Sequence, residues 1–258
     1  MSKRHSRGFT IIEVSLFLAL SGFLMVGLIA SANSSISRQR YNDSVNDVAD
    51  FIRGLYAEVI NTSLNRTDGG RSTTQAVYGK MIDFNRARTG SVSKIDVYTI
   101  VGTATNSSSD LLNANIKDVL DSTHLQANIM TTGSPTQIYE KQTHNLPWDT
   151  SIENADGTWA KGILLILRSP TSGTVYTYYY NTYPSSALNQ NSFQQILTNA
   201  SNTNDVDLCI DSPDNNYGVR RNLRIQANAS GSSGVALVAQ DSSDNRCGTG
   251  NSGNTPTS

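Results

Sequence analysis

Cysteine, histidine and proline are scarce in this chain of 258 residues, which contains two cysteines, three histidines and six prolines. So few thiols and imidazoles provide none of the close Cys and His spacings that bind zinc. Charged residues make up only 16% of the chain, with 20 Lys and Arg against 21 Asp and Glu. Because this balance is slightly acidic, the sequence carries no global basic signal for binding nucleic acid.

Sequence motifs for catalysis are also lacking. The chain has no nucleophile elbow and no Walker loop, and His124 and His144 stand apart from any candidate nucleophile. We therefore expect no enzymatic activity and no cofactor. Acidic residues do gather near both cysteines, at Asp205, Asp207, Asp211, Asp214, Asp241 and Asp244. Calcium prefers such clustered oxygen ligands, but the EF-hand spacing is absent, so we expect solvated loop acids and no metal site.

One long apolar run is present near the N-terminus. It follows a basic leader, residues 1–8, and extends to Ala32 with Glu13 as its single charge. About twenty apolar residues suffice to span a bilayer. The leader contributes three cations and no acid: Lys3, Arg4 and Arg7. By the positive-inside rule the leader stays cytoplasmic and the remainder of the chain is exported.

The residues around the end of the leader, Gly8-Phe9-Thr10-Ile11-Ile12-Glu13, form a specific pattern. This pattern resembles the processing site of type IV pilins and type II secretion pseudopilins, in which prepilin peptidase cuts after the glycine and the new terminus is N-methylated. The resemblance implies cleavage after Gly8, methylation of Phe9 and an assembly role for Glu13. It also implies a bacterial structural subunit, first in the inner membrane and then in a surface pilus or pseudopilus.

Glu13 has a physical reason to need a partner. A carboxylate at the centre of a membrane helix costs about 2.5–3.5 kcal/mol on insertion scales. Cleavage after Gly8 creates an α-ammonium about one helical turn before Glu13, so staggered helices of neighbouring subunits can pair the two charges. Such a buried pair fixes register more than it adds stability, because desolvation offsets much of the Coulomb attraction.

Three other interpretations of the apolar run remain. Ala30-Ser31-Ala32 would satisfy the cleavage rule of a secretory signal peptide, although the run is longer than usual and contains Glu13. A plain signal anchor fits the length but leaves Glu13 unexplained. A buried core helix fits poorly with a run of more than about 18 residues at the chain terminus.

The apolar run continues into an amphipathic helical pattern. Apolar side chains recur at spacings of 4, 3, 4, 3 and 4 at Tyr41, Val45, Val48, Ile52, Leu55 and Val59. This periodicity predicts one helix over residues 9–60, with a transmembrane segment over 9–32. We expect the stripe to pack against a sheet rather than to form a coiled coil, because the pattern lasts under three heptads. Gly22 and Gly27 are its weak points or close-packing positions.

The exported part, residues 61–258, has the pattern of an antiparallel sheet. Residues 162–168 and 174–183 flank a turn cluster, and residues 222–229 and 234–240 flank a second one. Two such hairpins predict a sheet of about four strands. The tyrosines of the first hairpin, at 176, 178, 179, 180 and 183, could form a binding face, but packing roles are favoured by their β-propensity.

Several smaller features complete this region. Residues 93–101 predict a strand, residues 102–109 a loop and residues 110–120 a short helix capped by Asp110. An even cysteine count in an exported domain favours a disulfide between Cys209 and Cys247, bounding the C-terminal region 209–247. Residues 248–258 read as a tail.

Together these patterns predict an α+β fold in which a long N-terminal helix packs on a C-terminal antiparallel sheet, as in pilins. The expected partners are prepilin peptidase/N-methyltransferase, other pilin subunits and the membrane through residues 9–32, with a surface or host receptor as a further candidate. A minor or tip pilin for adhesion or DNA uptake, or a pseudopilin, remains an alternative. Ala30 stands where major pilins often have a proline, which leaves room for both.

Overall fold

The computed structural model describes residues 10–61, 75–84, 94–104, 125–129, 142–154, 162–169, 172–182, 190–211, 220–238 and 246–247. The chain divides into two compact units, Met1–Asp43 and Ser44–Ser258. The predicted leader, the predicted helix over residues 110–120 and the predicted tail lie outside the described residues. The α+β class is confirmed, since the described part combines helices with antiparallel sheets.

The first helix, α1, spans Ile11–Asn61 and confirms the prediction of one long helix with a shift of one or two residues at each end. It remains helical through Gly22 and Gly27. In the second unit the predicted stripe is buried, because Val45, Val48, Ile52, Leu55 and Val59 are each at most 2% exposed. The period of 3.6 residues therefore identified the face that packs on the sheets.

The larger sheet is antiparallel, with the strand order β3-β2-β1-β6-β7, and β4 also pairs with β2. Its strands are β1 (Gln75–Asp83), β2 (Lys94–Ala104), β3 (Leu125–Ile129), β4 (Gln142–Asn145), β6 (Ile163–Arg168) and β7 (Val175–Tyr180). β3 and β4 pair with successive parts of β2, residues 100–104 and 94–97. Gly79 lies at the bulge in β1, where an added Cβ would overlap the Ile166 carbonyl oxygen.

The smaller sheet is also antiparallel, with the order β10-β9-β8-β5. Its strands are β5 (Ser151–Asn154), β8 (Val206–Asp211), β9 (Arg221–Ile225) and β10 (Val235–Val238). A 3-10 turn, η3 (Pro147–Asp149), follows β4 and precedes β5, so residues 142–154 connect the two sheets. A second turn, η4 (Ser232–Gly234), precedes β10.

Strand β6 is the centre of the core, because helices cover both faces of the larger sheet. Ile163, Leu165 and Leu167 pack with Phe193 and Ile196 of helix α3 (Gln190–Asn199) in one buried cluster. On the opposite face α1 approaches β7, where the Tyr56 hydroxyl lies 2.7 Å from Thr177 Oγ1. Burial on both faces explains why β6 reads as a continuous apolar run.

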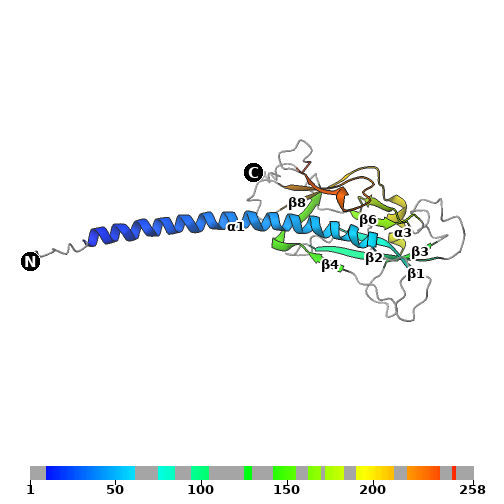
Figure 1. The fold of residues 1–258 in the computed structure, drawn as a ribbon, viewed down its shortest axis with the longest axis horizontal. Coiled ribbons are helices and arrows are strands. Elements are labelled where there is room, and N and C mark those ends of the chain that lie inside the picture. Colours follow the sequence, from blue (N-terminus) through cyan, green and yellow to red (C-terminus); the bar gives the residue numbers. More distant parts are fainter. Residues whose placement is uncertain are drawn as a thin grey trace, which may run out of the picture. The chain divides into compact units, whose positions relative to one another are not determined.

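The last turns of α1 also reach the smaller sheet, so the part of the helix from Ser44 onward lies between the two sheets (Figure 1). Arg53 Nε donates to the carbonyl oxygen of Val235 at the start of β10, at 3.2 Å. On the other side Glu58 forms an ion pair of 2.7 Å with Lys80 of β1. The helix therefore makes polar contacts with both sheets, in addition to burying its apolar stripe between them.

The single sheet of about four strands was a wrong prediction. Both hairpins exist, but β6 and β7 belong to the larger sheet and β9 and β10 to the smaller one. Each hairpin pairs with a strand that sequence reasoning did not assign, β1 beside β6 and β8 beside β9. The predicted strand at residues 93–101 is confirmed as β2, but residues 102–104 continue it and are not loop.

Candidate membrane anchor and assembly site

The amino end of α1 is capped by Thr10. The Thr10 carbonyl oxygen accepts hydrogen bonds from the backbone N–H groups of Glu13 and Val14, at 3.1 and 3.2 Å. The Thr10 hydroxyl also accepts from the Glu13 N–H, at 3.3 Å. A threonine at the cap with a glutamate three residues later is the capping-box pattern, which sequence reasoning missed although the spacing was visible.

Glu13 therefore has one role that the helix itself explains. A carboxylate in the first turn interacts favourably with the positive end of the helix dipole. Its side chain is exposed within its own unit. Gly8 and Phe9, the predicted processing residues, lie outside the described residues, so the roles of all three remain predictions.

The first turns of α1 form an apolar surface without a covering layer. The segment Ile11–Ile29 has a mean hydropathy of 2.2 and is long and apolar enough to cross a membrane. None of it is buried, and Ile11 and Phe23 are 90% and 80% exposed. The core helix of a soluble protein would be mostly buried, and exposed apolar surface of this extent is typical of membrane or protein contacts. A signal sequence near the N-terminus can satisfy the same criteria of length and hydropathy.

The smaller sheet carries a cluster of polar side chains beside the predicted disulfide. Cys209 and Cys247 are bonded, and both are buried, which confirms the pairing. Cys209 lies opposite Asn222 of β9 and Glu153 of β5, so these three side chains share one face of the sheet. The bridge attaches residues 246–247 to that face.

Asp207 and Asp211 are partnered strand residues, which corrects the prediction of solvated loop acids for these two, whereas Asp205 lies before β8 and is exposed. Asp207 Oδ1 accepts hydrogen bonds from Asn222 Nδ2 at 2.9 Å and from Arg224 Nε at 2.8 Å, and the side chain is only 6% exposed. Arg220 lies 2.9 Å from Glu153 and 3.4 Å from Asp211. These carboxylates neutralise arginines. Asp214, Asp241 and Asp244 lie outside the described residues.

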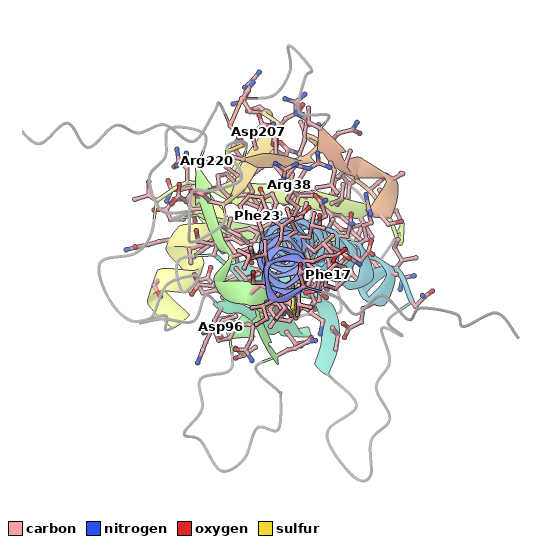
Figure 2. The ribbon with its side chains drawn as sticks, turned by 90° about the vertical axis from the view of Figure 1, so that its left-hand side faces the viewer. Phe17, Phe23, Arg38, Asp96, Asp207 and Arg220 are labelled. Atoms are coloured by element: carbon pink, nitrogen blue, oxygen red, sulfur yellow. A yellow bond between two sulfur atoms is a disulfide. The ribbon has the colours of Figure 1, made fainter. Side chains whose placement is uncertain are left out.

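Figure 2 shows Asp207 and Arg220 together on one side of the second unit and Asp96 on the opposite side. Asp96 accepts a hydrogen bond from the Thr143 hydroxyl at 2.8 Å, between β2 and β4. Within the described ranges, no group of three or more His, Cys, Asp or Glu side chains is arranged to hold a metal ion. The acids of the two sheets therefore lie apart and do not form a common site.

The connection between the sheets is tied to α1 by polar contacts. His144 Nε2 lies 2.9 Å from Asp47 Oδ2, and its ring stacks on Phe51 with centroids 4.0 Å apart. The hydroxyls of Ser44 and Thr150 are 2.6 Å apart and lie 3.2 and 2.9 Å from the Pro147 carbonyl oxygen. His144 therefore has a structural role. His124 lies outside the described residues.

Trp148, at the centre of η3, is unusual in two respects. Its φ of 58° and ψ of 35° are left-handed, which costs a bulky L residue about 1–2 kcal/mol. Its side chain is 53% exposed, although aromatic rings of this size are normally well buried. The paired hydroxyls of Ser44 and Thr150 hold the turn at Pro147, and this explains how the strained backbone persists.

The hairpin tyrosines divide between the two faces of the larger sheet. Tyr178 is buried in the cluster beneath α3, and Tyr176 and Tyr180 pack against that cluster. Tyr179 points to the other face, over Gly162, and burial raises its pKa to about 12. The favoured packing role is therefore confirmed for these four. Tyr183 lies outside the described residues.

Comparisons with protein-family models, with curated proteins and with solved structures found no match to this chain. The class that the structure defines is an α+β protein with one exposed N-terminal helix of membrane-spanning length and one disulfide. The resemblance to pilins therefore rests on the residues from Gly8 to Glu13 and on the order of the elements.

Proposed function

We propose that this chain is a structural subunit of a type IV pilus or related filament. It is inserted in the inner membrane through residues 9–32, cleaved after Gly8 and N-methylated at Phe9. It then polymerises through α1 into a surface filament, with prepilin peptidase and other pilin subunits as its partners. The observation that carries the proposal is the apolar segment Ile11–Ile29, which is unburied and contains one acid at its start.

The chemistry of that segment suits two successive environments. Lipid covers an apolar helix before assembly, and the apolar helices of neighbouring subunits can cover it afterwards. Glu13 is costly in lipid, and the α-ammonium created at Phe9 is its natural counter-ion on an adjacent subunit. The pair sets the axial position of each incoming subunit.

The second unit supports a structural role for the exported part. Its core is formed by α1, α3 and two antiparallel sheets, and its disulfide suits an oxidising compartment outside the cytoplasm. A minor pilin or a pseudopilin is the second candidate, favoured by the absence of proline from α1. Stoichiometry in sheared filaments distinguishes a minor pilin, and a secretion block without loss of surface fibres distinguishes a pseudopilin.

Mass spectrometry of the mature amino terminus tests the processing step. We expect the chain isolated from its native membrane or filament to begin at N-methylated Phe9. A chain that begins at Asn33 would instead be an exported protein released by signal peptidase, and a chain that retains Met1 would contradict processing altogether.

The assembly role of Glu13 is tested by separating its charge from its capping function. Glu13→Gln removes the charge, while glutamine remains compatible with a capping box. Thr10→Ala removes the cap and keeps the charge. We expect Glu13→Gln, like Glu13→Ala, to insert in the membrane but fail to enter filaments, whereas Thr10→Ala assembles. Equal loss in Glu13→Gln and Thr10→Ala would indicate a capping role alone, and normal fibre yield in Glu13→Gln would refute the ion pair.

A further inference from the structure

Cationic side chains flank the proposed membrane segment at both ends, but processing removes those at one end. The leader carries three, and the positive-inside rule places them in the cytoplasm. Cleavage after Gly8 removes all three. In the chain that begins at Phe9 the first cationic side chains are Arg38 and Arg40, because residues 14–37 contain no charge. The processed subunit therefore keeps its nearest arginines on the exported side alone.

Arg38 and Arg40 belong to the same unit as the apolar segment, Met1–Asp43, and lie on the same helix. Both are exposed within that unit. A hydrocarbon core of about 30 Å takes about 20 helical residues, so with Glu13 at its inner boundary the core ends near Ala32. The two arginines follow six and eight residues later. Their Cα atoms then lie about 9 and 12 Å beyond the core along the helix axis.

Those positions suit the phosphate groups of the exported leaflet. The headgroup layer adds about 5–8 Å on each side of the hydrocarbon core. Long side chains of a helix lean toward its amino end, so a guanidinium about two turns beyond the core reaches back to that layer. Arginine extends in this way near the ends of membrane helices, and its guanidinium binds phosphate through paired hydrogen bonds.

We propose that Arg38 and Arg40 bind the headgroups of anionic phospholipids in the exported leaflet and hold the processed subunit at a fixed depth in the membrane. The inference rests on the membrane insertion in the proposed function. Because a helix has 3.6 residues per turn, side chains two positions apart project about 160° apart, to nearly opposite sides. The two arginines therefore contact two different lipids and not one shared ligand.

The test uses the full chain in detergent micelles, where native mass spectrometry counts the lipids that stay bound. We expect the wild-type chain to bind phosphatidylglycerol in preference to phosphatidylcholine, whose choline neutralises its phosphate. Arg38→Gln and Arg40→Gln should each weaken phosphatidylglycerol binding by about fivefold, and the double variant should lose both lipids. Arg246→Gln is the matched control, because it removes an exposed arginine of the second unit and should bind lipid as the wild type does.

Further measurements keep the test decisive if a glutamine variant fails to fold. The double variant Arg38→Lys, Arg40→Lys keeps both charges and should retain most of the binding. Added salt should weaken phosphatidylglycerol binding to the wild-type chain, because it screens exposed charges. Equal binding of the two lipids, or wild-type binding by the double glutamine variant, would overturn the proposal. Displacement of the lipid by excess inorganic phosphate would indicate a site for the free anion and would overturn the assignment to lipid.

The outcomes separate this inference from the proposed function. If the chain begins at N-methylated Phe9 and polymerises while the double glutamine variant binds phosphatidylglycerol normally, the filament proposal stands and the lipid contact is refuted. If the arginines bind lipid as expected but the chain never polymerises, the filament proposal fails and the lipid contact stands. A mature chain that begins at Asn33 would lack the membrane segment and would refute both.

Discussion

Arg220 shows how a charge is accommodated in the smaller sheet. Its side chain is 8% exposed and lies 2.9 Å from a Glu153 carboxylate oxygen that is itself nearly buried. Removal of one member of a buried pair leaves the other without compensation, and this costs about 3–5 kcal/mol. We therefore expect Arg220→Met to lower the free energy of unfolding by that amount, as measured by urea denaturation.

Arg246 provides the matched control for Arg220. Its side chain is 69% exposed and lies 3.6 Å from Asp207, so solvent screens the interaction. Arg246→Met should change the free energy of unfolding by less than about 1 kcal/mol. Equal losses in the two variants would show that burial does not determine the contribution of these arginines.

Tyr56 makes the subunit sensitive to alkaline pH. Thr177 donates its hydroxyl hydrogen to the Ala229 carbonyl oxygen at 2.6 Å, so the Tyr56 hydroxyl has to donate to Thr177 Oγ1. Burial raises the pKa of Tyr56 to about 12 from an ordinary value of 10.0, because the buried phenolate loses its hydration. The unfolded chain then releases this proton at a lower pH than the folded chain does.

The stability contribution from Tyr56 is therefore complete below pH 10 and is lost between about pH 10 and pH 12, by about 3 kcal/mol in total. Tyr56→Phe should flatten this part of the dependence of unfolding free energy on pH. Urea denaturation at a series of pH values measures the slope. An unchanged alkaline slope in Tyr56→Phe would assign the sensitivity to other groups, such as Tyr179.

At the scale of elements, the disulfide ties strand β8 to the segment around Cys247. The bridge closes a loop of 38 residues, for which the loss of chain entropy in the unfolded state corresponds to about 4 kcal/mol. We expect Cys209→Ala, Cys247→Ala to lower the free energy of unfolding by roughly this amount. Reductant should have the same effect on the wild-type chain and none on the variant. A variant as stable as the oxidised wild type would contradict the role of the bridge.

The elements that could be predicted are those in which a single signal dominates. The stripe of α1 has strict helical spacing, and both hairpins have clear turn clusters between apolar runs. Strand β8 was missed because the acids of Val-Asp-Leu-Cys-Ile-Asp draw attention to charge, whereas Val206, Leu208 and Ile210 alternate with them on the buried face. That alternation with a period of two was present in the sequence.

Helix α3 and the assignment of strands to sheets could not be predicted from such local signals. Phe193, Ile196, Leu197 and Ala200 follow helical spacing, but a ten-residue helix with no basic or acidic end carries weak boundary signals. Sheet membership depends on pairings between distant residues, such as Gly79 with Leu167. Local patterns identify a strand, and they do not specify which strand lies beside it.

For the candidate site, the sequence indicated which residues matter but not which side chains they contact in the fold. The motif from Gly8 to Glu13 and the cysteine pair were both found from the sequence alone, and the structure confirms the cysteine pair. The arginine partners of Asp207 and Asp211 come from β9 and the segment before it, so they become visible only when β8 and β9 are paired. Trp148 gave no signal at all, since a left-handed backbone angle has no sequence pattern for tryptophan.

At the scale of the whole molecule, the core belongs to the second unit. Every strand of the described residues and α3 lie within Ser44–Ser258, and so do the disulfide and the buried stripe of α1 from Val45 to Val59. The segment Ile11–Ile29 contributes no buried residue. Apolar surface that is exposed in the folded chain adds nothing to its folding free energy, because folding does not remove it from water.

We therefore expect a chain that begins at Ala30 to fold without the apolar segment. It should be soluble in the absence of detergent and unfold cooperatively, whereas the full chain should partition into detergent micelles. Ile52→Ala in the shortened chain tests whether the stripe of α1 holds this core, because it empties a fully buried site and should lower the free energy of unfolding by about 2–5 kcal/mol. Aggregation of the shortened chain would show that the apolar segment contributes to the fold and serves more than membrane and filament contacts. An Ile52→Ala variant as stable as its parent would show that the stripe of α1 does not hold this core.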